Sequence, residues 1–135
     1  MRASSALVLL LIVLSVVSGC GGGAYQYDLV PVSGVATCEG KPVANAIVNF
    51  TPQGAEDRPS GRPGAPAFGK TDDQGRFQLS TYNDNDGAIV GTHTVTIGLA
   101  PTDDSVSGRP AKFSCAEASL QVTVEPGMEE LQLDF

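Results

Sequence analysis

Apolar and polar residues alternate from Val30 onward, and this period of two is the feature that most constrains the fold. An extended strand turns successive side chains to opposite faces, whereas a helix needs apolar residues three and four positions apart. No stretch of this part of the sequence sustains the helical spacing. The pattern therefore predicts an all-β protein whose strands each have one polar and one apolar face.

The alternation predicts seven strands separated by turn-forming residues. They are expected at residues 32–38, 46–50, 67–71, 77–82, 92–99, 120–125 and 131–135. Glu39-Gly40 predicts a hairpin between the first two strands, and residues 72–75 predict another between the third and the fourth. Irregular connections, rich in Pro, Gly or polar residues, are expected at 53–67, 83–91 and 100–118.

Strands of this kind must bury their apolar faces against one another, and two antiparallel sheets stacked about 10 Å apart do so simply. We therefore expect a seven-stranded antiparallel Greek-key sandwich, of the prealbumin or immunoglobulin type. A small barrel satisfies the same pattern and stays open as an alternative. The 135 residues suffice for one such domain.

The first residues predict an export signal. Arg2 supplies a positive charge, and residues 6–17 are apolar except for Ser15. As a helix this stretch would be about 18 Å long, which is too short to cross a hydrocarbon core of ~30 Å. Residues 1–19 are therefore predicted to be a helical signal peptide.

The signal ends in Val17-Ser18-Gly19-Cys20, which resembles the lipobox of bacterial lipoproteins. The resemblance implies cleavage before Cys20, a diacylglyceryl group on its sulfur and acylation of the new amino terminus. Two or three acyl chains would hold the protein on a membrane of the cell envelope. Residues 20–29 are then expected to form a flexible tether beyond the lipid. The alternative is an ordinary signal peptide with a cysteine nearby by chance.

Three segments, in order, resemble the carboxypeptidase-regulatory-like, or transthyretin-like, domains. The first is G-K-P-V-x-x-A at residues 40–46, the second is T-D-x-x-G-x-F at 71–77, and the third is G-A-x-x-G-x-x-x-V-x-I at 87–97. The resemblance implies that residues 30–135 form a prealbumin-like sandwich without catalytic residues of its own. Cys38 and the long Pro- and Gly-rich connection depart from the family pattern.

Two cysteines, Cys38 and Cys115, remain once Cys20 carries lipid. An exported chain meets an oxidising compartment, so a disulfide between them is plausible. It would close a loop of about 78 residues and add at most about 4–5 kcal/mol to the free energy of unfolding. The alternative is two separate cysteines, with Cys38 buried and Cys115 in a loop.

The sequence predicts neither an enzyme nor a cofactor or metal site. His93 is the one histidine, and we expect it to pack at the boundary of the core. A nucleophile needs a base and an orienting group, and zinc needs several ligands, which this sequence does not supply. Asp72-Asp73 and Asp84-Asn85-Asp86 could offer oxygens to Ca²⁺, but without the order of an EF-hand loop. Solvated turn carboxylates are the simpler interpretation.

A net charge of −7 argues against nucleic acid as a partner. We expect a membrane-anchored structural or protein-interaction module with an envelope protein as partner. The alternative is a module that binds glycans on a sheet face, with Tyr82 as aromatic platform because the chain has no Trp. A third alternative, a remnant hydrolase, would need a set of His and Arg residues that the one histidine, His93, does not supply. Tyr25 and Tyr27 are expected at the surface or at the lipid headgroups.

Overall fold

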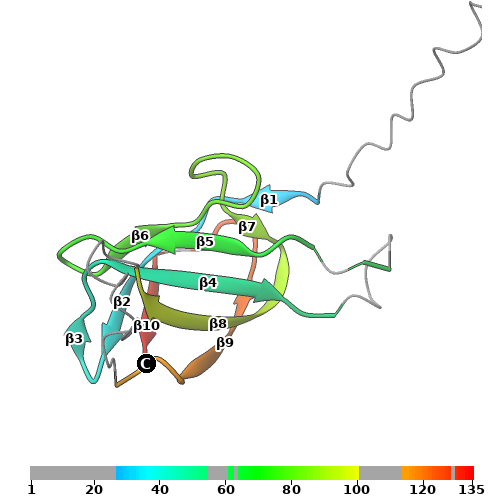
Figure 1. Cartoon of the computed structure of the whole chain (residues 1–135). Coiled ribbons are helices and arrows are strands. Elements are labelled where there is room, and N and C mark those ends of the chain that lie inside the picture. Colours follow the sequence, from blue (N-terminus) through cyan, green and yellow to red (C-terminus); the bar gives the residue numbers. More distant parts are fainter. Residues whose placement is uncertain (1–26, 55–60, 63, 101–113, 129) are drawn as a thin grey trace, which may run out of the picture.

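Figure 1 shows the computed structural model of the chain, which describes residues 27–54, 61–62, 64–100, 114–128 and 130–135. The prediction of an all-β protein is confirmed, because every regular element in these ranges is a strand. The strands are β1 (Leu29–Val30), β2 (Ser33–Cys38), β3 (Lys41–Pro42), β4 (Ala46–Pro52), β5 (Ala67–Lys70), β6 (Arg76–Gln78), β7 (Ala88–Ile89), β8 (Gly91–Leu99), β9 (Ser119–Val124) and β10 (Leu131–Asp134). The predicted signal peptide, with its helix, lies outside the described residues. Within them, no helix is long and apolar enough to cross a membrane.

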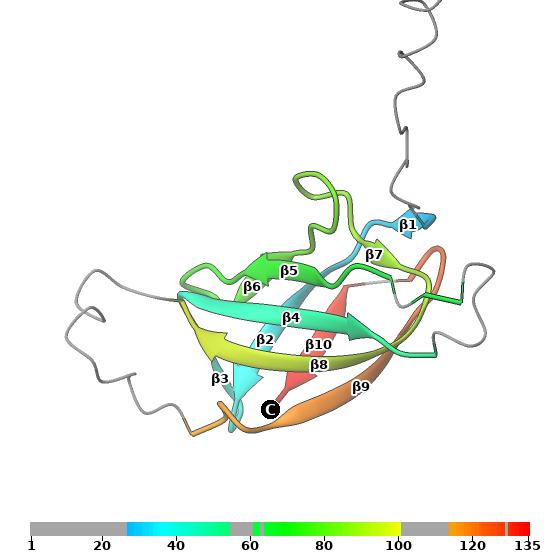
Figure 2. The ribbon, with the colours of Figure 1, turned by 45° about the vertical axis from the view of Figure 1, so that its right-hand side comes forward.

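Two four-stranded sheets stack face to face (Figures 1 and 2). One sheet, called the β4 sheet here, has the strand order β5-β4-β8-β9, and all its pairs are antiparallel. In the other, the β2 sheet, β10 lies along one side of β2, while β3 and β6 lie along the other. The predicted stacking of two sheets is thus present.

One core fills the space between the sheets, built from the side chains that alternation placed on the inner faces. In β4, Val48 and Phe50 are fully buried, whereas Asn49 between them points outward. In β8, Val95 and Ile97 point inward in the same way. Burial of such side chains is the main favourable contribution to folding, so the inner faces hold the two sheets together.

The predicted hairpin between the first two long strands is wrong. The turn at Glu39-Gly40 forms, with positive φ at both residues, but it folds only the short β3 back onto β2. Pro42 has no N–H with which to continue that ladder. Asn45 then adopts a φ of 51° and the chain crosses into the β4 sheet.

The turn at residues 72–75 likewise joins the two sheets instead of closing a regular hairpin. It forms as predicted, since the Asp72 carboxylate accepts hydrogen bonds from the backbone N–H groups of Gln74 and Arg76 at 2.8 and 2.9 Å. However, β5 pairs with β4 and β6 pairs with β2. One isolated bridge, from Phe68 to Ser80, connects the two sides of the turn.

Strand β10 pairs with β2 in the parallel direction, from Leu131 opposite Gly34 to Asp134 opposite Thr37. The prediction of a wholly antiparallel arrangement is wrong at this pair. Alternation determines which face a side chain occupies, but it does not determine the direction of a neighbouring strand. Only strands joined by a tight turn must be antiparallel, and most of the domain separates β2 from β10.

A short ladder that the sequence did not predict pairs β1 with β7. Leu29 was expected in the tether, and residues 88–89 were expected in a polar loop. Next to this ladder, the Tyr27 N–H donates to the Tyr82 hydroxyl at 3.2 Å, and the Tyr27 hydroxyl donates to the Arg62 carbonyl at 2.7 Å. The segment from Tyr27 onward is therefore attached to the domain.

Candidate functional site

Cys38 and Cys115 form a disulfide, so the alternative of two separate cysteines does not apply. Cys38 ends β2 in one sheet, and Cys115 lies just before β9 in the other. Both residues are buried, and the Ser114 hydroxyl donates to the Cys38 sulfur at 3.2 Å. The Cys115 sulfur lies 3.3 Å from the Phe135 carbonyl oxygen. The disulfide thus links the two sheets covalently, at the end of the sandwich that lies away from β1 (Figure 1).

His93 lies deeper than expected, fully inside the core rather than at its boundary. Its Nε2 lies 2.7 Å from the Ile89 carbonyl oxygen, and because a carbonyl only accepts, Nε2 carries the proton. The imidazole also packs against Phe50, with ring centroids 5.8 Å apart. A ring with no exposed surface cannot meet a substrate, so His93 serves packing.

The loop around Asp86 is organised by that carboxylate. Its oxygens accept hydrogen bonds from the backbone N–H groups of Thr81, Tyr82 and Asn83 at 2.6, 2.9 and 2.6 Å. Burial raises the pKa of Asp86, but these hydrogen bonds lower it by more, so the pKa lies below its ordinary value. The carboxylate is occupied in holding the loop.

We predict that Asp86→Asn destabilises the domain at neutral pH and that the difference from the wild type disappears in acid. Because the folded pKa is lowered, the stability that Asp86 contributes is present above the unfolded pKa of about 3.9. It is lost as the pH falls through the lower, folded value. Urea unfolding between pH 2.5 and pH 7 measures both effects. Asp84→Asn, an exposed change in the same loop, should show no difference at any pH.

Neither carboxylate pair considered for Ca²⁺ forms a cluster of ligands. No group of three or more His, Cys, Asp or Glu side chains gathers as a metal site within the described residues. Asp72 directs Oδ1 to the backbone of its own turn, as Asp86 directs both oxygens to its loop. Asp72 and Asp86 thus use these oxygens to accept hydrogen bonds from backbone N–H groups of their own turn or loop.

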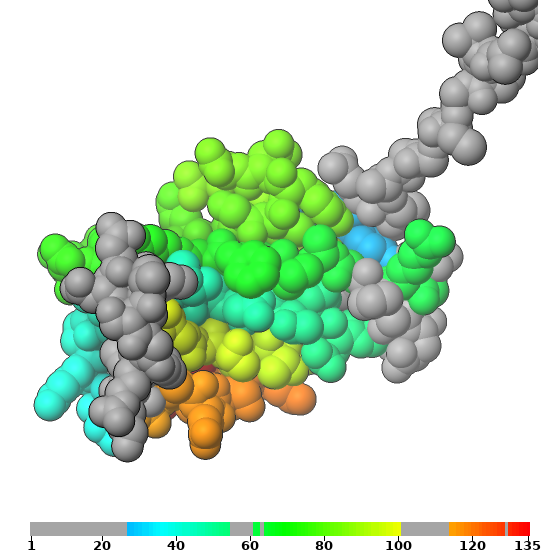
Figure 3. Space-filling model, viewed as in Figure 1, coloured from blue at the N-terminus to red at the C-terminus, as the bar shows by residue number. Residues whose placement is uncertain are grey.

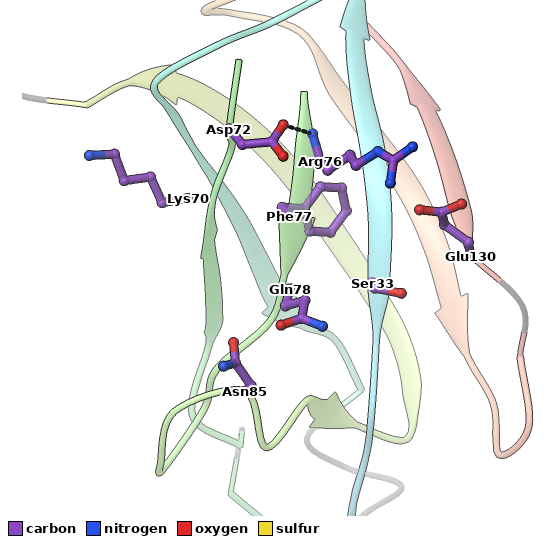
Figure 4. Close-up of a pocket in the computed structure, with 8 residues that line it drawn as sticks. All are labelled: Ser33, Lys70, Asp72, Arg76, Phe77, Gln78, Asn85 and Glu130. Carbon is purple, nitrogen blue, oxygen red and sulfur yellow. Dashed lines mark hydrogen bonds between the residues drawn. The ribbon is translucent and has the colours of Figure 1, made fainter. Parts of the chain in front are cut away.

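A polar groove of about 430 Å³ lies beside β6, where the two sheets separate (Figure 4). Its lining residues come from β2, β5, β6 and three connections between strands: Ser33, Lys70, Asp72, Arg76, Phe77, Gln78, Asn85 and Glu130. Alternation predicts that Ser33, Lys70, Arg76 and Gln78 point outward, on the face opposite to inward-pointing residues such as Phe77. It does not predict that they meet, because the groove depends on how the turn at 72–75 crosses between the sheets.

The lining of this groove combines charged, polar and apolar side chains. Figure 4 shows the Arg76 guanidinium extending in the direction of the Glu130 carboxylate, while Lys70 lies on the far side of β6. Phe77 is the buried apolar floor. The groove can bind polar groups through charge and hydrogen bonds. Among its lining residues, however, the Ser33 hydroxyl has no histidine beside it that could act as a base.

Comparison with known proteins gives no match to a family model, to a curated protein or to a solved structure. Cys20 and Tyr25, which the sequence singled out for lipidation and for headgroup contact, lie outside the described residues. Tyr27 lies inside them and is bonded to the domain.

Proposed function

We propose that this protein is a bacterial lipoprotein, held on a membrane of the cell envelope by acyl groups on Cys20. In this proposal residues 1–19 are the signal peptide, and residues 20–29 carry the lipid and lead into the folded part. Residues 30–135 are a Greek-key, carboxypeptidase-regulatory-like domain of seven principal strands. The domain is a non-enzymatic module for structure or for interaction with an envelope protein.

The buried Cys38–Cys115 disulfide is the observation that most supports export. Disulfides persist in secreted and periplasmic proteins and are rare in the reducing cytosol. A cytosolic protein would have little use for two cysteines placed to join its sheets. The bond therefore favours interpreting the apolar leader as an export signal.

The position of β1 supports a tethered arrangement. In Figures 1 and 2, β1 lies at one end of the sandwich, and the disulfide at Cys38 lies at the far end of β2. An anchor that joins the domain at β1 would leave both outer sheet faces accessible. The polar groove beside β6 supports binding as the role of those faces.

We predict that Cys20→Ser abolishes membrane attachment of the protein expressed in a bacterial host. Without the thiol no diacylglyceryl group can form, and two or three acyl chains are what hold such a protein on a membrane. Wild type should incorporate labelled palmitate and enter the detergent phase of a Triton X-114 extraction, whereas Cys20→Ser should do neither.

Ser15→Ala, within the apolar stretch but outside the lipobox, serves as the matched control and should behave as wild type. Equal labelling and equal partitioning of Cys20→Ser and wild type would refute the anchor. Recovery of unprocessed protein from the cytosol, with Cys38 and Cys115 as free thiols, would refute export as well.

A further inference from the structure

The outer face of the β4 sheet carries hydroxyl and amide groups with almost no charge. In Figure 3 this face is toward the viewer, with β5, β4, β8 and β9 as successive bands from green to orange. Its outward-pointing residues are Phe68 and Lys70 of β5, Ile47, Asn49 and Thr51 of β4, Thr92, Thr94, Thr96 and Gly98 of β8, and Ser119, Gln121 and Thr123 of β9. Lys70 alone among them is charged, in a chain with 15 acidic side chains.

Strand pairing arranges these groups in rows across the sheet. Phe68 lies opposite Asn49, which lies opposite Thr96, which lies opposite Ser119. The next row is Thr51, Thr94 and Gln121. Strands are about 4.8 Å apart, so a row across the four strands spans about 14 Å. That is the length of a short oligosaccharide, bounded by a hydroxyl at one end and an aromatic ring at the other.

Two features of the first row indicate a ligand. Phe68 is the most exposed large apolar side chain in the described residues, at 46%. On its cross-strand neighbour Asn49, the side-chain oxygen is shielded from solvent and has no hydrogen-bond partner. Because this oxygen is shielded, a ligand hydroxyl can donate to it only after the Asn49 side chain turns outward, and that contact would satisfy an acceptor left unpaired in the free protein. An aromatic platform, the Phe68 ring, and an unused acceptor, the Asn49 oxygen, thus lie on neighbouring strands.

We propose that this face binds a neutral polysaccharide, with one sugar ring stacked on Phe68 and neighbouring hydroxyls bonded to the row that contains Asn49 and the row that contains Thr51. Sugar rings present C–H faces that pack on an aromatic ring, and their hydroxyls both donate and accept, as Thr, Ser, Asn and Gln side chains do. An anionic polymer would be repelled by the net charge of −7 and would find one cation, Lys70, on this face.

The aromatic residue on this face is not the one that the sequence suggested as a platform for a sugar. Tyr82, expected to offer the aromatic ring, is half-buried, and its hydroxyl accepts the Tyr27 N–H. Phe68 supplies that ring instead. The inference deepens the proposed function, since it rests on the anchor to bring this face to envelope glycans. Binding itself does not depend on the anchor.

The test uses the full chain in detergent and measures co-sedimentation with insoluble cellulose, chitin and starch, and retardation in native gels containing amylose. Polygalacturonate serves as the acidic probe. We expect retention by at least one neutral polysaccharide and none by polygalacturonate. Phe68→Ala should weaken retention at least tenfold, and Asn49→Ala should weaken it severalfold, because one removes the stacking surface and the other the acceptor.

Val90→Ala is the matched control, because Val90 is an exposed apolar residue outside this face, at 40% exposure. It should bind as wild type, and thermal melts should show that Phe68→Ala remains folded. Failure of every neutral polysaccharide to bind, or unchanged binding by Phe68→Ala, would overturn the proposal. Phe68-dependent self-association without glycan binding, seen by sedimentation, would also overturn it. None of these three results would affect the Cys20 anchor, which the fractionation experiment tests separately.

Discussion

Replacing both Cys38 and Cys115 by Ala is expected to lower the free energy of unfolding by up to about 4–5 kcal/mol. The bond closes a loop across a sequence separation of 77 residues, and the loss of that constraint enlarges the unfolded ensemble. For a domain of this size the melting temperature should fall by roughly 10–20 °C. Urea and thermal unfolding of the wild type and the double variant, both without reductant, measure the effect.

A reductant provides the internal control for this prediction. Both cysteines are buried, at 8% and 5% exposure, so dithiothreitol should reach the disulfide only when the domain unfolds. In urea with dithiothreitol, the wild type should unfold like the double variant, while the variant itself should be unaffected. If the wild type and the double variant had equal unfolding midpoints in the absence of reductant, the disulfide would not stabilise the domain.

Gly75→Ala is expected to destabilise the domain by about 2–5 kcal/mol, which is the second large effect. Gly75 has a φ of 77°, a conformation that costs residues with a Cβ about 1–2 kcal/mol. An added Cβ would also lie 2.5 Å from the Ala36 carbonyl oxygen. The Gly75 carbonyl accepts the Ala36 N–H at 2.8 Å, so relief of the clash would disturb a hydrogen bond worth about 1–3 kcal/mol if left unmade.

Gly40→Ala separates the two causes. Gly40 has nearly the same φ, 76°, but nothing lies within 4 Å of the position that its Cβ would occupy. It should therefore cost about 1–2 kcal/mol from backbone strain alone. Chemical unfolding of both variants gives the comparison. Equal losses for Gly40→Ala and Gly75→Ala would show that the close approach to Ala36 is without consequence.

The sequence was enough to predict which side chains of a strand point into the core and which point to solvent. This depends only on the alternation of successive residues along the strand. A strand with the pattern of β8 must bury Val95 and Ile97 if it exposes Thr94 and Thr96, whatever its neighbours are. The same rule placed Val48 and Phe50 inside. Turn positions were also predictable, since Gly75 and the Asp72 carboxylate act on residues close in sequence.

The partners of the strands could not be predicted in this way. Whether the chain after Glu39-Gly40 stays in one sheet or crosses to the other depends on packing between strands far apart in sequence. The short β1–β7 ladder contains too few residues for alternation to be recognised. The groove and the Phe68 row follow from these pairings, so the candidate sites become visible only in the folded arrangement.

The parallel partnership of β2 and β10 has a consequence for how the domain is made. A hydrogen bond from the Thr37 hydroxyl to Asp134 spans 97 residues, and the neighbouring ladder requires similar separations. Contacts this distant in sequence slow folding, because a large loop must close before any of them forms. Synthesis proceeds from the amino terminus, so β2 stays without this partner until residues 131–134 have been made. If the chain is exported as we propose, such late folding would keep it unfolded while it crosses a narrow translocation pore, and β10 would pair with β2 only on the other side.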